Sequence, residues 1–406
     1  MFRVLYVAPI LAYPPAGGPE MDIVNSVKAL SRSAELHIAG TVQQDTVSSE
    51  AEAFFKDRSA AFHYVPSART GYPARISRRV RRTVTGRTGL DADAAWILSY
   101  YRRHSMDAIW CDRGEELSVD LILALKAADP TARVVCDTCA VYSQFILREL
   151  PFADSDARKQ SILEAGRKKE AQERSLVTIA DVTTAVSEID AGYYRSISPA
   201  PESVMLFSNV VDVDAYQQVA PPAGFSKPAI VSPGTYYSVH SPMAEGAQWF
   251  VDQVLPLIRQ TVPSVTTYFV GKGSDQHLRS ILDGNDPRLV ATGRVRSVLP
   301  FLSNADVCVV PLHFESGTRF KILEAGACGT PVVSTTLGAE GLPVQSERHL
   351  LLADTPDAFA AAVVRVLRDR ELADRLAAEL RTLVDAEFGI GRLAAEGTRV
   401  LDYLRR

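Results

Sequence analysis

The sequence predicts an α/β protein built from two doubly wound parallel sheets. Short apolar runs of strand length alternate with segments of helical periodicity, which is typical of parallel sheets covered by helices. The alternation begins at residue 2, stops at a segment rich in proline and small residues at 219–228, and begins again at 229. The chain has 406 residues, a length that accommodates two to three domains of common size.

Seven strand candidates lie in the N-terminal half. They cover residues 2–9, 35–40, 61–65, 107–112, 133–137, 180–187 and 203–208, and residues 209–212 end the last of them. Apolar residues recur at helical spacing in Ile23, Val27 and Leu30, and helices are also expected over 117–128 and 167–176.

Two glycines and two acids are expected at one edge of this first sheet. Gly17 and Gly18 stand where the first strand turns into its helix, and Asp112 and Asp137 each end a strand. Ligands of such sheets bind outside the carboxyl ends of the strands, and glycine lets backbone approach them closely. The glycines also fit a tight turn without a ligand, and the acids also fit helix caps or loop charges.

Residues Arg69 to Arg87 have the composition of a basic amphipathic helix. They contain seven arginines and no acid, and Ile76, Val80 and Val84 would share one side of the helix. Such a helix can lie on an anionic membrane surface, stay solvated or dock on its own domain. A formal net charge of −4 gives no overall signature of nucleic-acid binding, so no nucleic-acid partner is expected.

The C-terminal half repeats the strand–helix pattern. Strand candidates cover 229–234, 266–273, 289–294, 306–311, 331–334 and 349–353, and helices are expected over 242–258, 356–368, 370–388 and 391–404. We therefore expect a domain at 1–212, a linker at 213–228 and a domain at 229–390, with a cleft between the two sheets.

Composition points to a globular protein of the reducing cytoplasm. Apolar residues make up 47% and charged residues 23% of the chain, and its five cysteines are most simply buried free thiols. Cys136 and Cys139 have a metal-like spacing, but no second pair accompanies them. The sequence shows neither a secretory leader pattern nor an apolar run of about 18 residues, so no membrane span is expected.

The strongest local signal lies in residues 315–334. A Ser-Gly-Thr turn can cap a helix that runs through Arg319 and Lys321 to Cys328, and Gly329 can end it in a left-handed conformation. Cations are unfavourable in a first helical turn, because the helix dipole is positive there. Two of them indicate that an anion binds at this terminus, although a solvated basic turn also fits.

The motifs of the chain together resemble a known family. Gly317-Thr-Arg-Phe-Lys-Ile-Leu-Glu324, preceded by Gly271-Lys-Gly273 and Gly293-Arg294, is similar to the retaining GT-B glycosyltransferases of glycosyltransferase family 4. The turn at 14–18 and residues 185–188 and 209–212 fit the same family, so the resemblance covers nearly the whole chain. It implies a GT-B fold whose last helix, 391–406, packs back on the N-terminal domain.

The resemblance implies sugar transfer from a nucleotide-diphosphate sugar to an acceptor hydroxyl, with retention, in glycan or glycoconjugate biosynthesis. Glu324 is implied to hold the ribose hydroxyls, and we infer that Arg319 and Lys321 neutralise the diphosphate. The implied binding residues are Gly17, Gly18, Gly234, Gly271, Arg294, Arg319, Lys321 and Glu324, and the implied catalytic residues are Asp112 and Glu315. No metal or cofactor is implied; the acceptor would be a saccharide, a lipid-linked saccharide or a small molecule. If the arginine segment binds membrane, the protein would be peripheral on its inner face.

The sequence departs from the family pattern in three places. The first of two family glutamates falls at Ser316, one position after Glu315; the loop 233–240 lacks the usual Arg and Lys; and Asp112 occupies the place of a common catalytic histidine. A nucleotide-sugar epimerase, a glycosyl phosphorylase and a non-catalytic sugar-nucleotide binding protein therefore remain as alternatives. A nicotinamide dehydrogenase would also show this alternation, but no Gly-x-Gly-x-x-Gly follows the first strand.

Overall fold

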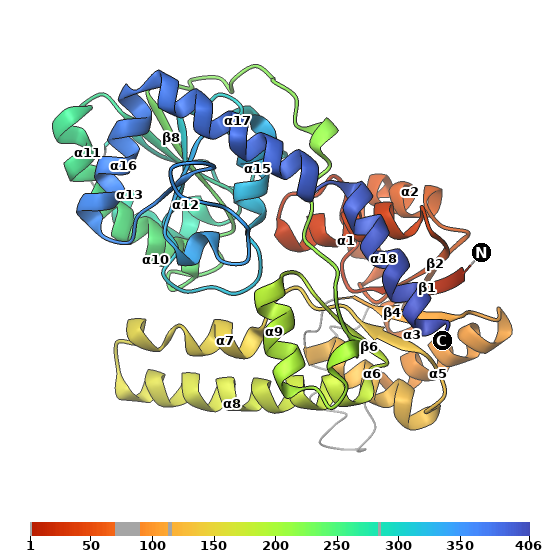
Figure 1. Cartoon of the computed structure of the whole chain (residues 1–406). Coiled ribbons are helices and arrows are strands. Elements are labelled where there is room, and N and C mark those ends of the chain that lie inside the picture. The colour runs from red at the N-terminus through yellow and green to blue at the C-terminus, as the bar shows by residue number, and fades with distance from the viewer. Residues whose placement is uncertain (1, 70–89, 113–115, 283–285) are drawn as a thin grey trace. The chain divides into compact units, whose positions relative to one another are not determined.

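Figure 1 shows the computed structural model of the chain, which describes residues 2–69, 90–112, 116–282 and 286–406. The chain forms two compact units. The first comprises Met1–Pro15, Pro19–Asn209 and Ile390–Arg406, and the second comprises Ala16–Gly18 and Val210–Gly389. The arginine-rich segment Arg69 to Arg87, for which a membrane surface is one of three expected environments, lies outside the described residues except for Arg69, the last residue of α3.

The first unit is built on a seven-stranded sheet in the order β3-β2-β1-β4-β5-β6-β7, and every pairing in it is parallel. Its strands are β1 Phe2–Ala8, β2 Ala34–Gly40, β3 Ala61–Tyr64, β4 Ala108–Cys111, β5 Val134–Cys136, β6 Val182–Ala185 and β7 Val204–Leu206. Six of the seven residues of β1 are buried, as expected of a central parallel strand with helices on both faces.

Nine α-helices lie in the described part of the first unit. They are α1 Gly18–Leu30, α2 Ser49–Asp57, α3 Pro66–Arg69, α5 Leu90–Arg103, α6 Glu116–Ala128, α7 Tyr142–Leu147, α8 Asp156–Ile179, α9 Glu188–Ile197 and, near the C-terminus, α18 Ile390–Leu404, with the short η2 Leu150–Phe152 between α7 and α8. Ser155 caps α8, so this helix begins well before the expected position 167. Its exposed, charged first half lacks the apolar periodicity on which the expectation rested.

The chain after β7 differs from the expected strand end at 209–212. Residues 208–212 are not strand, because their amides have other partners. The Ser208 N–H donates to a carboxylate oxygen of Glu396 in α18 at 2.7 Å, and the Val211 N–H donates to the carbonyl of Phe388 at 2.9 Å. Glu396 is fully buried, so this contact fixes α18 to the end of β7.

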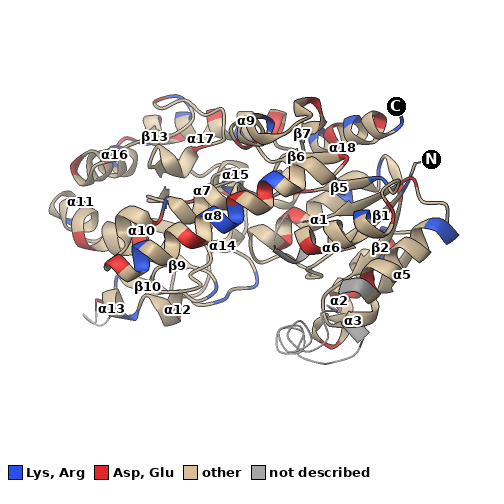
Figure 2. Cartoon of the chain, turned by 90° about the horizontal axis from the view of Figure 1, so that it is seen from below, with Lys and Arg blue, Asp and Glu red and all other residues tan. Residues whose placement is uncertain are grey.

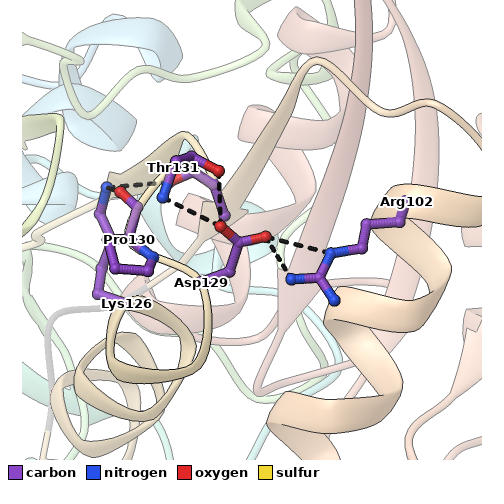
Figure 3. Close-up of polar contacts among 6 residues, drawn as sticks. Arg102, Lys126, Asp129, Pro130 and Thr131 are labelled. Atoms are coloured by element: carbon purple, nitrogen blue, oxygen red, sulfur yellow. Dashed lines mark hydrogen bonds and ion pairs between the residues drawn. The ribbon is translucent and has the colours of Figure 1, made fainter.

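One ion pair joins α5 to the end of α6 (Figure 3). The guanidinium of Arg102 donates twice to one oxygen of Asp129, at 3.1 and 2.5 Å. The backbone amide and hydroxyl of Thr131 donate to the other oxygen at 3.0 and 2.6 Å. These contacts hold the pKa of Asp129 at about 2, with the Thr131 hydroxyl as the largest cause and Arg102 next.

The second unit is built on a six-stranded parallel sheet in the order β10-β9-β8-β11-β12-β13. Its strands are β8 Ala229–Pro233, β9 Thr266–Val270, β10 Leu289–Ala291, β11 Val307–Val310, β12 Val332–Ser334 and β13 Leu351–Leu352. All residues of β8, β9 and β11 are buried, which explains why these strands read as continuous apolar or small-residue runs.

Helices cover this second sheet. They are α10 Pro242–Trp249, α11 Leu255–Thr261, α12 Ser274–His277, α13 Arg279–Leu282, α14 Leu299–Leu302, α15 Phe320–Cys328, α16 Pro356–Arg368 and α17 Arg370–Glu387. The single helix expected over 242–258 is interrupted by a π-helical turn at Phe250–Val254. Pro256 accounts for the interruption, because its ring cannot accommodate the carbonyl four residues earlier and it has no N–H to donate.

Surface charges in the described ranges are mixed in sign (Figure 2). Along α8, Arg174 pairs with Glu170 at 2.9 Å and Lys159 pairs with Asp156 at 3.3 Å. Among the described residues, no helix is both long enough and apolar enough to cross a membrane.

Candidate functional site

The order of strands in the second sheet creates one crevice at its carboxyl edge. The first strand of the unit, β8, has β9 on one side and β11 on the other. The connections that leave β8 and β11 therefore part in opposite directions, and such a switch point is where open α/β sheets bind ligands. Residues 234–241 follow β8 and residues 311–319 follow β11, so the candidate site in this unit is made by these two loops.

Two glycine-containing turns lie against each other beside this crevice. Gly271 has a φ of +135°, and a Cβ built there would lie 2.0 Å from the carbonyl oxygen of Gly234. The Gly234 N–H donates to the carbonyl of Val270 at 2.9 Å, and the Tyr236 N–H donates to that of Lys272 at 2.8 Å. Glycine at 271 is thus required for the backbones after β8 and β9 to approach this closely.

Arg294 lies farther along the same edge, in the loop after β10. It follows Gly293, whose φ is +65° and whose N–H donates to the hydroxyl of Ser274 at 3.0 Å. The Arg294 side chain is exposed. The structure therefore places it at the carboxyl end of the sheet, two strands away from β8.

The expected cation-bearing helix start lies at the switch point. The helix α15 begins at Phe320, and Arg319 occupies the N-cap position without a capping side-chain hydrogen bond. The expected Ser-Gly-Thr cap is therefore wrong, because the residue at the N-cap has no short side-chain oxygen. The prediction for the other end is confirmed, since Gly329 ends the helix with a φ of +69°.

Arg319 and Lys321 differ in their surroundings. Arg319 is only 3% exposed and donates through Nη1 to the carbonyl of Gly317, which itself has a φ of +81°. Lys321 is half-buried, and no described acid lies within 4.0 Å of its ammonium. Removal from water lowers the pKa of Lys321; the carboxylate of Glu315 raises it and the charge of Arg319 lowers it. Two cations thus crowd the start of one helix.

Glu324 lies one turn further along α15 and is 9% exposed. Burial raises its pKa to about 7, against the opposing effects of a hydrogen bond from Tyr216 and of the Lys321 charge. The Tyr216 hydroxyl donates to Oε1 of Glu324 at 3.1 Å. This contact spans 108 positions of the sequence, and no motif indicated it. Glu315 is partly exposed in the loop before the helix.

The first sheet has its own switch point, between β1 and β4. Asp112 follows β4 and is 1% exposed, and the hydroxyl of Tyr6 in β1 donates to one of its oxygens. Gly18 is the first residue of α1, and Gly17 precedes it. The Tyr6–Asp112 contact was not predicted; the only sequence signal is a tyrosine within the largely apolar strand β1.

Asp137, expected at the same edge, has a structural environment. The indole N–H of Trp110 donates to one carboxylate oxygen at 2.9 Å, and the hydroxyl of Thr184 donates to the other at 2.5 Å. These contacts join β4, β5 and β6 at their carboxyl ends. The five cysteines are free. Within the ranges that the structure describes, no group of three or more His, Cys, Asp or Glu side chains could hold a metal ion.

Comparison with known sequences finds similarity to a family profile in part of the chain. Residues 228–369 match the profile described as "Glycosyl transferases group 1". Two curated relatives, glycogen synthases of Mycobacterium tuberculosis strains CDC 1551 / Oshkosh and H37Rv, are 32% identical over 141 residues, which is 33% of this chain and 34% of theirs. The chain therefore matches about a third of the length of these relatives.

Comparison with solved structures covers the whole chain. Anabaena HepE in complex with UDP-glucose superimposes with a TM-score of 0.69 at 14% identity, over 99% of this chain and 100% of HepE. Sucrose-phosphate synthase from Thermosynechococcus elongatus gives 0.70 at 15% identity, over 100% and 99%. The expected fold class is confirmed: the chain has two Rossmann-like parallel α/β units of the GT-B type.

Proposed function

We propose that the protein is a glycosyltransferase that moves a sugar from a nucleotide-diphosphate sugar to an acceptor hydroxyl. The observation that carries the proposal is the pair Arg319 and Lys321 at the start of α15, at the switch point of the second sheet. The match of residues 228–369 to group 1 glycosyl transferases supports it. So does the presence of UDP-glucose in a solved structure with the same fold.

In this proposal the second unit binds the donor. The amides of the first turn of α15, Arg319 and Lys321 surround the diphosphate, and the carboxylate of Glu324 accepts the ribose hydroxyls. As the bond between the sugar and the diphosphate breaks, negative charge grows on the leaving diphosphate. A guanidinium and an ammonium held in a partly dehydrated site stabilise that charge more strongly than water does.

The carboxyl edge of the first sheet supplies the acceptor site in this proposal. Asp112 lies at its switch point, with one oxygen held by Tyr6, and the turn at Gly17 and Gly18 lies at the end of the neighbouring strand β1. A fixed, buried carboxylate can orient an acceptor hydroxyl or accept its proton. Retention of the anomeric configuration and a role in glycan or glycoconjugate synthesis extend the proposal by family resemblance.

Titration calorimetry with UDP and uridine tests the donor site. For the Arg319→Ala/Lys321→Ala double variant, we expect UDP affinity to fall by about tenfold or more, since a hydrogen bond to a charged group contributes about 1.5–3 kcal/mol. Uridine carries no phosphate, so its affinity should change little. Equal UDP affinity in the wild type and the double variant would refute the diphosphate site.

Arg381→Ala is the matched control. Arg381 donates to the carbonyl of Ala327 at 3.0 Å, so the variant removes a cation from the opposite end of the same helix. UDP affinity should be retained in this variant. Retention of configuration is tested separately, by NMR of the sugar first released from UDP-glucose: an α-anomer supports retention, and a β-anomer contradicts it.

A further inference from the structure

Tyr216 lies in the segment between β7 and β8 and connects this segment to α15. It directly follows the short 3-10 helix η4, Val213–Ala215. Its ring packs against the hydrophobic core of that unit, and its hydroxyl donates to Oε1 of Glu324 at 3.1 Å. A tyrosine that buries its ring and directs its hydroxyl at one carboxylate oxygen restricts the rotation of that carboxylate.

Neighbouring contacts hold Tyr216 in place. The side-chain amide of Gln218 donates to the carbonyl of Ser303 at 2.9 Å. In the return direction, the side-chain amide of Asn304 donates to the carbonyl of Val219 at 2.9 Å. Both partners lie just after α14, so the backbone that follows Tyr216 is fixed to the same unit as Glu324. The tyrosine is therefore set by the fold and not by a free loop.

We infer that Tyr216 is a positioning residue for donor binding: it holds Glu324 with one oxygen occupied and the other directed at the donor ribose. The inference rests on the proposed donor site. It goes beyond that site because it assigns a role to Tyr216, which lies outside the motifs that carry the family resemblance.

The charge state of Glu324 makes the inference measurable. Burial raises its pKa to about 7, whereas the hydrogen bond from Tyr216 and the charge of Lys321 both lower it. The two thiols near Glu324 stay neutral: burial raises the pKa of Cys308 in β11, and raises that of Cys328 to about 12. Burial also raises the pKa of Tyr216, so it stays a donor over the neutral range. Arg381 of α17, Glu315 and Asp212 complete the charged surroundings.

The sign of the pH dependence follows from these contacts. The ionised carboxylate accepts hydrogen bonds from both the tyrosine and a ribose hydroxyl, whereas the protonated acid has less acceptor capacity. Donor affinity should therefore increase as pH rises through about 7. Loss of the Tyr216 hydroxyl removes a contact that favours the ionised form of Glu324, so the pH midpoint of the change in donor affinity should move upward.

Titration calorimetry of UDP binding between pH 6 and pH 9 tests this in the full chain, with Tyr216→Phe against the wild type. We expect the midpoint to move up by about one pH unit, which reduces the ionised fraction at pH 7 from about one half to about one tenth. UDP affinity at pH 7 should fall about fivefold, and the two proteins should converge near pH 9. The preference for UDP over 3′-deoxy-UDP should shrink in the variant.

Two further variants separate this role from a structural one. Tyr193→Phe removes a hydroxyl that donates to the buried Glu173 of the first unit at 2.8 Å, and should leave UDP binding and its pH profile unchanged. Glu324→Gln should leave only the pH dependence that the terminal phosphate of UDP contributes through its second pKa of about 6. Absence of UDP binding by the wild type would overturn the proposed donor site and this inference together. UDP binding with the same pH profile in Tyr216→Phe and the wild type would overturn this inference alone.

Discussion

Substitution of Gly271 by alanine should damage the second unit through a backbone-to-backbone collision. Gly271 has a φ of +135°, and its added Cβ would lie 2.0 Å from the carbonyl oxygen of Gly234. Neither backbone can move away easily: the Gly234 N–H donates to Val270 at 2.9 Å, and the Gly271 N–H donates to the Thr292 hydroxyl at 3.3 Å.

Two costs add at this position. A non-glycine residue in this backbone region costs about 1–3 kcal/mol, and forcing extra volume into a packed site costs about 1–3 kcal/mol more. We therefore expect the free energy of unfolding to fall by about 2–6 kcal/mol, a large part of the about 5–15 kcal/mol of an ordinary domain. Because the turns that collide follow β8 and β9, UDP affinity should fall as well.

Gly329→Ala is the matched control. Its φ is +69°, so alanine is strained there too, but an added Cβ would meet nothing within 4 Å. That strain alone costs about 1–2 kcal/mol. Urea unfolding followed by circular dichroism, and calorimetry with UDP, compare the two variants. Equal destabilisation by the two substitutions would show that the collision with Gly234 contributes nothing, and would refute the reasoning.

Two further predictions concern carboxylates of the first unit. Asp129→Asn should lower stability at pH 7, because contacts with Thr131 and Arg102 favour the ionised form (Figure 3). The folded-state pKa of Asp129 is about 2, so the stability that its carboxylate contributes is present above the ordinary aspartate pKa of about 3.9 and is lost as pH falls towards 2. Urea unfolding from pH 7 to pH 2 should therefore show the difference in free energy of unfolding between wild type and variant shrinking. A difference that stays constant with pH would contradict this. Glu396→Ala should cost about 1–3 kcal/mol, since it leaves the buried Ser208 N–H without its 2.7 Å acceptor. Hydrogen exchange should then accelerate first in α18, and unchanged protection there would contradict the assignment.

The fold could be predicted because the central strands of both units are buried on both faces. Strand β11 therefore reads as an unbroken apolar run, and β1 as an apolar run interrupted only by the exposed Arg3. The ends of the helices were harder to predict from the sequence. The charged first half of α8 has no apolar stripe to reveal it, and Pro256 interrupts a helix that periodicity alone presents as continuous.

The contacts that shape the candidate sites could not be predicted from local patterns. Glycines and cations of the second unit are adjacent to recognisable motifs, whereas Tyr216 and Glu324 are 108 positions apart. Tyr6 and Asp112 are similarly separated, by 106 positions. In each pair the tyrosine contributes a hydroxyl to a buried acid from another element, and only the strand order and the path of the chain bring them together. The functional roles of these residues stay predictions.

The start of α15 shows why a binding site and a stable apo structure make opposing demands. A cation near a helix N-terminus is unfavourable by about 0.3–1 kcal/mol, because it faces the positive end of the dipole. Here two cations share that end. Burial together with the neighbouring guanidinium lowers the pKa of Lys321. A lowered lysine pKa is what a site that disfavours positive charge should produce. Arg319 offsets part of its own desolvation by donating to the Gly317 carbonyl. A bound diphosphate would reverse the balance at this end of the helix, because its charge is favourable to the dipole and to both side chains. The unfavourable arrangement in the free protein is thus the physical reason to expect an anionic ligand there.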